Sequence, residues 1–85
     1  MSFGRNPHVP KAQAAEQKAR DAGDDVARIR AFREAAHLWD RAAEREQPGS
    51  RRTEYEAKAT RAREIADGAA EDGRHDEPAD PKLLN

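Results

Sequence analysis

Apolar residues recur at helical spacing in three segments of the chain, separated by short stretches that contain glycine or proline. From Pro10 to Ala22 the apolar positions are alanines three and four residues apart, which predicts a helix with one narrow small-residue stripe. After the breaker sequence "QPGS", Tyr55 and a second series of alanines repeat this spacing, with Ile65 at the edge of the stripe. The pattern predicts helices at about residues 10–22, 25–46 and 51–68.

The middle segment has the widest apolar face. At 100° per residue, Ile29, Phe32 and Trp39 share one face with several alanines, and Leu38 lies on its flank, so the face spans an arc of about 200°. A helix that is apolar over about half of its circumference is contacted from two sides. We therefore expect it to be the central helix of an all-α fold, a small antiparallel three-helix bundle. The predicted core residues are Ile29, Phe32, Trp39, Tyr55 and Ile65.

The two ends of the chain differ in composition from the predicted bundle, which occupies residues 10–70. Residues 1–9 include "RNPHVP", whose two prolines predict an extended N-terminal arm. Residues 71–85 are rich in Asp, Glu, Gly and Pro, which predicts a disordered acidic tail. The tail ends in Leu83 and Leu84, which are either part of a flexible end or the anchors of a short motif that folds on docking to another protein.

The near-neutral net charge of the chain disfavours some classes of binding partner. Sixteen basic and seventeen acidic residues give a net charge of −1, so the field that attracts nucleic acid or an anionic membrane is missing. No apolar run approaches the roughly 20 residues that span a membrane, and the first residues lack the apolar segment of a secretory signal. The absence of cysteine fits a reducing compartment. We expect a cytoplasmic protein, and the excess of Arg over Lys with abundant Ala indicates a bacterial source.

Candidate catalytic and metal-binding patterns are weak in this sequence. The three histidines are far apart, and His37 has no second histidine four residues away that would complete a helical metal site. No serine or threonine stands in a context that activates a nucleophile. We expect no enzymatic activity, no metal and no cofactor.

The stretch "AFREAAHLWDRAAEREQP" resembles the second helix of a tetratricopeptide (TPR) repeat. Phe32, Ala35, Trp39 and Ala42 stand at the alternating aromatic and small positions of that pattern. Arg30 occupies the place of the turn glycine of the repeat. Because that glycine is missing, we expect one unbroken helix here and no turn within it.

Residues 11–70 resemble the three-helix MIT domain over a greater length. The sequence pattern "EAA.LW..A" is similar to that of its middle helix. The stretch "YEAKATRAREIA" is similar to its third helix, with Lys58, Arg61 and Ile65 in similar places. The resemblance implies an interaction module that holds a partner peptide in a groove between helices two and three.

Candidate partner-binding residues lie on the flanks of the predicted helices. Leu38 is on the side of the central helix away from Ile29, where it could serve as an exposed anchor. Arg28, Arg33 and Lys58 could form a basic rim for an acidic peptide, including the chain's own tail. The alternative is that these basic residues belong to solvated faces with weak ion pairs, because carboxylates are interleaved at helical pair spacing.

Three hypotheses for function follow. The first is a non-catalytic adaptor that binds a peptide or helix of another protein beside the central helix. The alternative is a self-associating structural subunit, because a bundle with so few large apolar side chains gains stability by forming a homo-oligomer. The third is a nucleic-acid accessory protein, which the charge balance disfavours.

Overall fold

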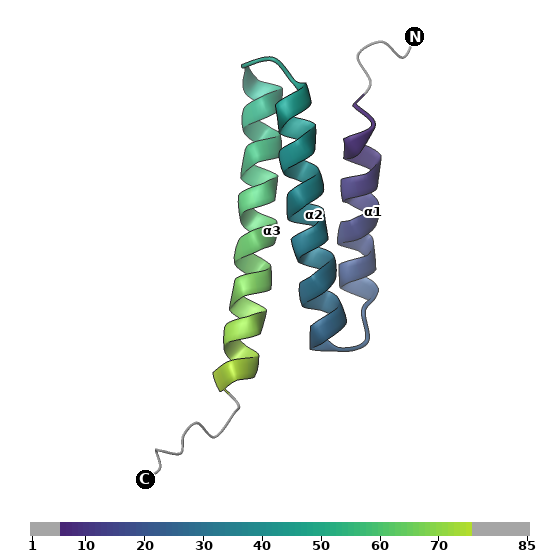
Figure 1. Ribbon diagram of the computed structural model, residues 1–85, viewed down its shortest axis with the longest axis vertical. Helices are drawn as coiled ribbons and strands as arrows, with labels where there is room; N and C mark the ends of the chain where they lie inside the picture. Colours follow the sequence, from purple (N-terminus) through teal and green to yellow (C-terminus); the bar gives the residue numbers. More distant parts are fainter. Residues whose placement is uncertain (1–5, 76–85) are drawn as a thin grey trace.

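A computed structural model describes the backbone of residues 6–75 and the side chains of residues 6–70. Within this range it contains three helices and no strand: α1 (His8–Asp21), α2 (Asp25–Arg45) and α3 (Ser50–His75). Short turns join consecutive helices, which therefore run antiparallel (Figure 1). The prediction of an all-α, antiparallel three-helix bundle is confirmed.

Helix α1 begins at His8, so the predicted extended arm of residues 1–9 is wrong at its last two positions. Asn6 explains this early start, because its Oδ1 accepts a hydrogen bond from the backbone N of His8 at 3.1 Å. The backbone oxygen of Asn6 accepts a second one from Val9 N at 3.2 Å. Pro10 lies in the first turn, where its missing N–H would have no intrahelical acceptor.

Helix α2 begins at a capping aspartate. The side chain of Asp24 accepts a hydrogen bond from Ala27 N at 2.8 Å, which satisfies a backbone donor at the helix start. The helix then continues without a break past Arg30 to Arg45, as the missing turn glycine predicts.

Helix α3 continues past Gly68, where the sequence pattern predicted its end. None of the glycines in the described part of the chain adopts a positive φ, so Gly68 is an ordinary helical residue and not a stop. Packing also extends beyond this point, because Ala66 is buried and Ala69 and Ala70 are half-buried. Alanine has the highest helix propensity, which favours continuation of the hydrogen-bond ladder to His75.

The longer α3 changes the predicted boundary of the tail. Residues 71–75 belong to the helix, so the prediction of a disordered segment at 71–85 is wrong for its first five positions. Residues 76–85, including Leu83 and Leu84, lie outside the described residues.

The core consists of alanines and two aromatic side chains. Phe32 and Trp39 are buried as predicted, and Ile29 and Tyr55 are half-buried against them. Ile65 is 42% exposed, so its prediction as a core residue is wrong. It lies at the edge of the α3 stripe, where the side chain points past α2. The buried alanines of the core come from all three helices: Ala12, Ala15, Ala19, Ala31, Ala35, Ala36, Ala42, Ala59, Ala62 and Ala66.

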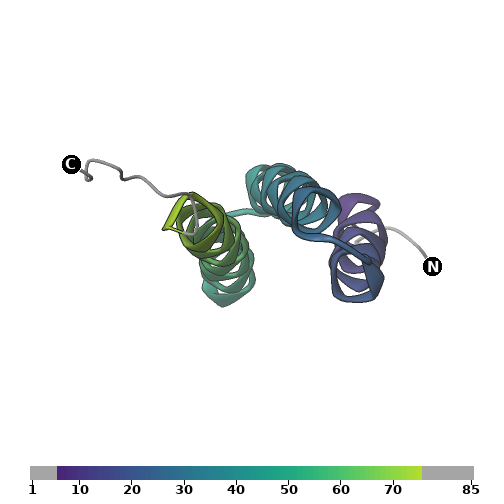
Figure 2. The same cartoon turned by 90° about the horizontal axis from the view of Figure 1, so that it is seen from below.

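The three helices form an open arch. Both α1 and α3 pack on α2, but among the described helices no pair of Cα atoms within 8 Å joins α1 to α3. Figure 2 shows the two outer helices displaced to the same side of α2. The narrow alanine stripes of α1 and α3 each bury one face, whereas the wide face of α2 accepts both neighbours. We call the concave side of the arch, over α2 and between α1 and α3, the channel.

Candidate functional site

Trp39 forms the floor of the channel and is only 1% exposed. Its indole Nε1 donates a hydrogen bond to Oε2 of Glu16 on α1 at 2.7 Å. From α3, the ring of Tyr55 lies with its centroid 5.5 Å from that of Trp39 and tilted by 31°, and Lys58 places Nζ 5.3 Å from the Trp39 ring centroid. Side chains of both α1 and α3 therefore contact Trp39.

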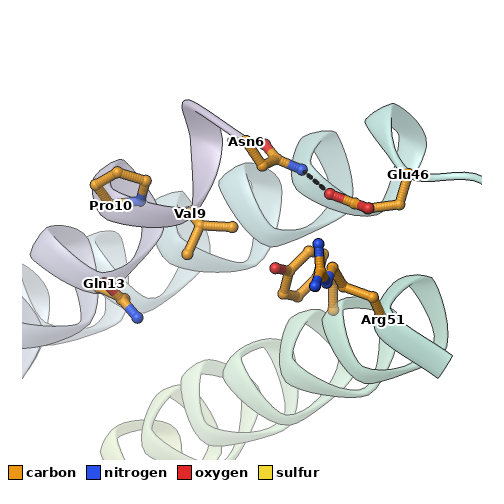
Figure 3. Close-up of a pocket in the computed structure, with 7 residues that line it drawn as sticks. Asn6, Val9, Pro10, Gln13, Glu46 and Arg51 are labelled. Carbon is orange, nitrogen blue, oxygen red and sulfur yellow. Dashed lines mark hydrogen bonds between the residues drawn. The ribbon is translucent and has the colours of Figure 1, made fainter. Parts of the chain in front are cut away.

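Two hollows flank this cluster along the channel, and each takes side chains from all three helices or their ends. The first, of about 330 Å³, lies at the N-terminal end of α1, and we call it the N-terminal hollow (Figure 3). It is lined by Asn6, Val9, Pro10, Gln13, Glu46, Arg51 and Tyr55. The second, of about 410 Å³, contains three basic side chains and one carboxylate, and we call it the basic hollow. It is lined by Glu16, Arg20, Phe32, Lys58, Arg61, Ala62 and Ile65.

The N-terminal hollow is closed at one edge by a buried amide. Asn6 is only 6% exposed, and its Nδ2 donates to the backbone O of Ala42 at 2.8 Å and to Oε2 of Glu46 at 3.0 Å. Figure 3 shows the second of these bonds across the mouth of the hollow. The polar groups at this edge already satisfy one another, so they hold the start of α1 against the end of α2.

The basic hollow carries positive charge that no described side chain pairs with. Among the described residues, no carboxylate lies within ion-pair distance of Arg20, Lys58 or Arg61. The one carboxylate of the hollow, Glu16, accepts the hydrogen bond of Trp39. The exposed Ile65 lies among these cations, so the hollow combines an apolar contact with positive charge.

The opposite face of α2 and α3 is paired. Nη1 of Arg63 lies 2.8 Å from Oδ2 of Asp40, and Nη1 of Arg33 lies 3.3 Å from Oδ1 of Asp67. These two ion pairs connect α2 to α3 outside the channel. In contrast, the three cations of the basic hollow have no such partner among the described residues.

The predicted basic rim is not a single site. Arg28 pairs with Asp25 at 2.7 Å near the start of α2, and Arg33 pairs with Asp67 outside the channel. Of the three predicted basic residues, only Lys58 lies in the channel. The prediction of one basic rim is therefore wrong, because the three residues lie at different places on the bundle.

Leu38 lies on the other side of the arch from the basic hollow. It is half-buried and lines a shallow hollow between α1 and α2 together with Lys11, Ala14, Ala15, Lys18 and Glu34. It therefore packs at the junction of these two helices and lines neither of the channel hollows. The groove implied by the MIT resemblance, between helices two and three alone, also differs from the channel, whose hollows use α1 as a wall.

Glu16, Arg20 and Asn6 are channel residues that the sequence analysis missed. Glu16 and Arg20 belong to the polar face of a helix with many charges, and nothing in their spacing distinguishes them from its other polar residues. Asn6 precedes Pro7 in a segment interpreted as loop. A polar residue just before a proline at a helix start is a capping signal, and it could have indicated that Asn6 is ordered.

The environment of His8 perturbs the pKa of its imidazole. The ring is half-buried against α2, and its Nδ1 is buried with no hydrogen-bond partner among the described residues. Burial lowers the pKa of His8, and the positive charges of Arg41, Lys11 and Arg45 lower it further. The neutral imidazole is therefore favoured in the folded state.

The described part of the chain contains neither a metal cluster nor a membrane-spanning element. Among residues 6–70, whose side chains the structure describes, no three side chains of His, Cys, Asp or Glu gather closely enough to hold a metal ion. None of the three helices combines the length and the apolar composition needed to cross a membrane.

The fold and the channel define the class of protein as an open three-helix bundle with a basic hollow on its concave side. In comparisons with known proteins, the chain matches no family model, no curated protein and no solved structure.

Proposed function

We propose that this chain is a non-catalytic adaptor of the cytoplasm that binds a peptide or helix of a partner protein in its channel. The observation that carries the proposal is the basic hollow, where Arg20, Lys58 and Arg61 have no ion-pair partner among the described residues and surround the exposed Ile65. The TPR and MIT resemblances also imply an interaction module, and the proposal differs from them in placing the partner segment in the channel.

The chemistry of the hollow specifies the partner segment. A segment seated in the channel contacts α1 and α3 at once and covers Ile65, which contributes about 25 cal/mol for each Å² of apolar surface removed from water. Carboxylates on its flanks would pair with the three cations, which favours fast and selective association. The expected ligand is an extended or helical segment with an apolar side chain flanked by Asp or Glu.

The lining of the basic hollow supports binding without catalysis. It contains no hydroxyl, thiol or imidazole group that could act as a nucleophile or a proton-transfer group. Its one carboxylate, on Glu16, is held by the indole of Trp39.

The experiment that tests the proposal is an affinity purification of the tagged chain from a lysate of its source cells, with two matched variants. The channel variant is Arg20→Glu/Arg61→Glu. The control variant is Lys18→Glu/Arg30→Glu, which makes the same change in net charge at exposed positions outside the channel. Lys18 matches Arg20 because both lie in the last turn of α1.

The two variants give distinct outcomes. A different protein that is recovered in near-stoichiometric amount with the wild type and the control variant, but not with the channel variant, supports the proposal. Loss with the control variant alone would contradict it, and Lys18→Glu and Arg30→Glu tested singly would then show whether the site lies beside Leu38 or beside Val26. Circular dichroism and thermal melting of both variants check that the fold is retained.

Self-association is the second candidate, and the exposed side chain of Val26 favours it. Val26 is 66% exposed and lines a hollow on α2 with Ile29, Arg30 and Arg33. A second copy covering this surface would add to a core built mainly of alanine. Sedimentation equilibrium and melting at increasing concentration test this candidate, because a homo-oligomer predicts a rise in both mass and melting temperature.

A further inference from the structure

We infer that the chain's own segment 76–85 docks in the basic hollow and occupies the channel until a partner displaces it. The segment carries three carboxylates and one cation, Asp76, Glu77, Asp80 and Lys82, and then Leu83 and Leu84. Its net negative charge and large apolar side chains complement the exposed Ile65 of the hollow and the three cations that have no ion-pair partner among the described residues. The inference deepens the proposed function, because it concerns the regulation of the same surface.

The geometry permits this contact. Helix α3 ends at His75, at the end of the bundle where the turn between α1 and α2 lies (Figure 1). Ile65 lies ten residues before His75, or about 15 Å along the helix, and Arg61 lies about 21 Å from it. An extended chain advances about 3.1 Å per residue. If two residues reverse the direction, Leu83 reaches about 19 Å back along the channel, between the levels of Ile65 and Arg61.

One carboxylate of the segment, that of Asp80, falls where the hollow begins, whereas Asp76 and Glu77 lie in the reversal beside His75. Arg20 lies one residue before the end of α1, at the same end of the bundle as His75. Asp80 lies three residues past the reversal, about 9 Å along the channel. Pro78 and Pro81 favour an extended path, which limits the entropy that the segment loses on docking.

Tethering makes a weak contact effective. A short covalent connection raises the local concentration of the segment to the order of millimolar, so even a weak interaction is populated. A partner segment of the same chemistry must then compete with the tethered one. The docked segment thereby lowers the apparent affinity of the channel for a partner and selects partners with more carboxylates or more apolar area.

The test uses paramagnetic relaxation in the full chain, which has no cysteine of its own. A nitroxide label on Asn85→Cys is expected to remove the amide signals of Ile65 and Arg61, while the amide of Val26, at the start of α2 and far from the docked label, keeps its intensity. In the channel variant this loss is expected to disappear, whereas the control variant is expected to retain it. High salt is expected to restore the signals without changing the helix content.

Three results would overturn the inference. Equal attenuation of the Ile65 and Val26 amides, unchanged in the channel variant, would show a segment that is not docked. Attenuation that persists in the channel variant would show that the cations do not hold it. Attenuation in unlabelled chains mixed with spin-labelled chains would assign the contact to a second copy. The measurement needs no partner, so a negative result leaves the proposed adaptor function to be decided by the affinity purification.

Discussion

Replacing Glu16 by alanine removes the acceptor that the buried indole N–H of Trp39 uses. The hydrogen bond of 2.7 Å joins α1 to the centre of the core, and Trp39 is the largest fully buried side chain among the described residues. A hydrogen bond to a charged group contributes about 1.5–3 kcal/mol to the free energy of unfolding. Because Glu16 is half-exposed, water can replace part of the lost bond, and we expect a loss of about 1–2 kcal/mol.

This loss is large for so small a protein. At about 0.05–0.15 kcal/mol per residue, the described part of the chain has a free energy of unfolding of about 4–10 kcal/mol. A change of 1–2 kcal/mol therefore lowers the melting temperature by about 4–16 °C. Urea unfolding followed by circular dichroism and by the fluorescence of Trp39 measures the change with two independent signals.

A double-mutant cycle separates the hydrogen bond from other effects of the substitution. Trp39→Phe keeps an aromatic ring but removes the N–H, so the coupling energy between Glu16→Ala and Trp39→Phe reports the bond itself. Gln17→Ala, at the neighbouring exposed position of α1, is the control and should stay within about 0.5 kcal/mol of the wild type. A coupling energy below about 0.3 kcal/mol would refute the role assigned to this bond.

Three further predictions follow from single residues. Gly68→Ala should raise the free energy of unfolding by about 0.5–1 kcal/mol in urea unfolding, because Gly68 is inside α3 and an added Cβ would meet no atom within 4 Å. Unchanged or lower stability would contradict its place in the helix interior. Asn6→Ala should lower the free energy of unfolding by about 1–3 kcal/mol, because three hydrogen bonds of a buried amide side chain are lost, and should expose the start of α1 to hydrogen exchange. The pKa of His8 is lower in the folded than in the unfolded chain, so its contribution to stability is present above about pH 6.5 and is lost as the pH falls below that value. Urea midpoints at about pH 7.5 and pH 5 should therefore differ more for the wild type than for His8→Gln, and equal differences would contradict burial of the ring.

The helical pattern of the chain could be predicted from its sequence because local spacing and breaker residues determine it. Phe32 and Trp39 repeat at the period of a helix that is buried on its wide face, and Asp24 is a strong capping residue. The end of α3 could not be predicted in the same way. Gly68 is a stop signal only if it adopts a positive φ, and here the packing of the neighbouring alanines keeps it helical.

The set of charged residues in the channel could not be predicted beyond Lys58, because it depends on which side of each helix faces the concave side of the arch. Lys58 and Arg33 have the same kind of sequence environment, yet one lies over Trp39 and the other pairs with Asp67. The roles of Glu16 and Arg20 depend on the packing of α1 against α2.

The sequence by itself determined that this chain forms three helices around a central one, because the period and width of its apolar stripes require burial on those faces. Only the tertiary structure decided that the outer helices stay apart. Alanine stripes bring each of them close to α2 but are too narrow to reach across to the other outer helix. The remaining gap is bridged by Glu16, Tyr55 and Lys58 over Trp39, and it leaves the cations beside Ile65 facing outward.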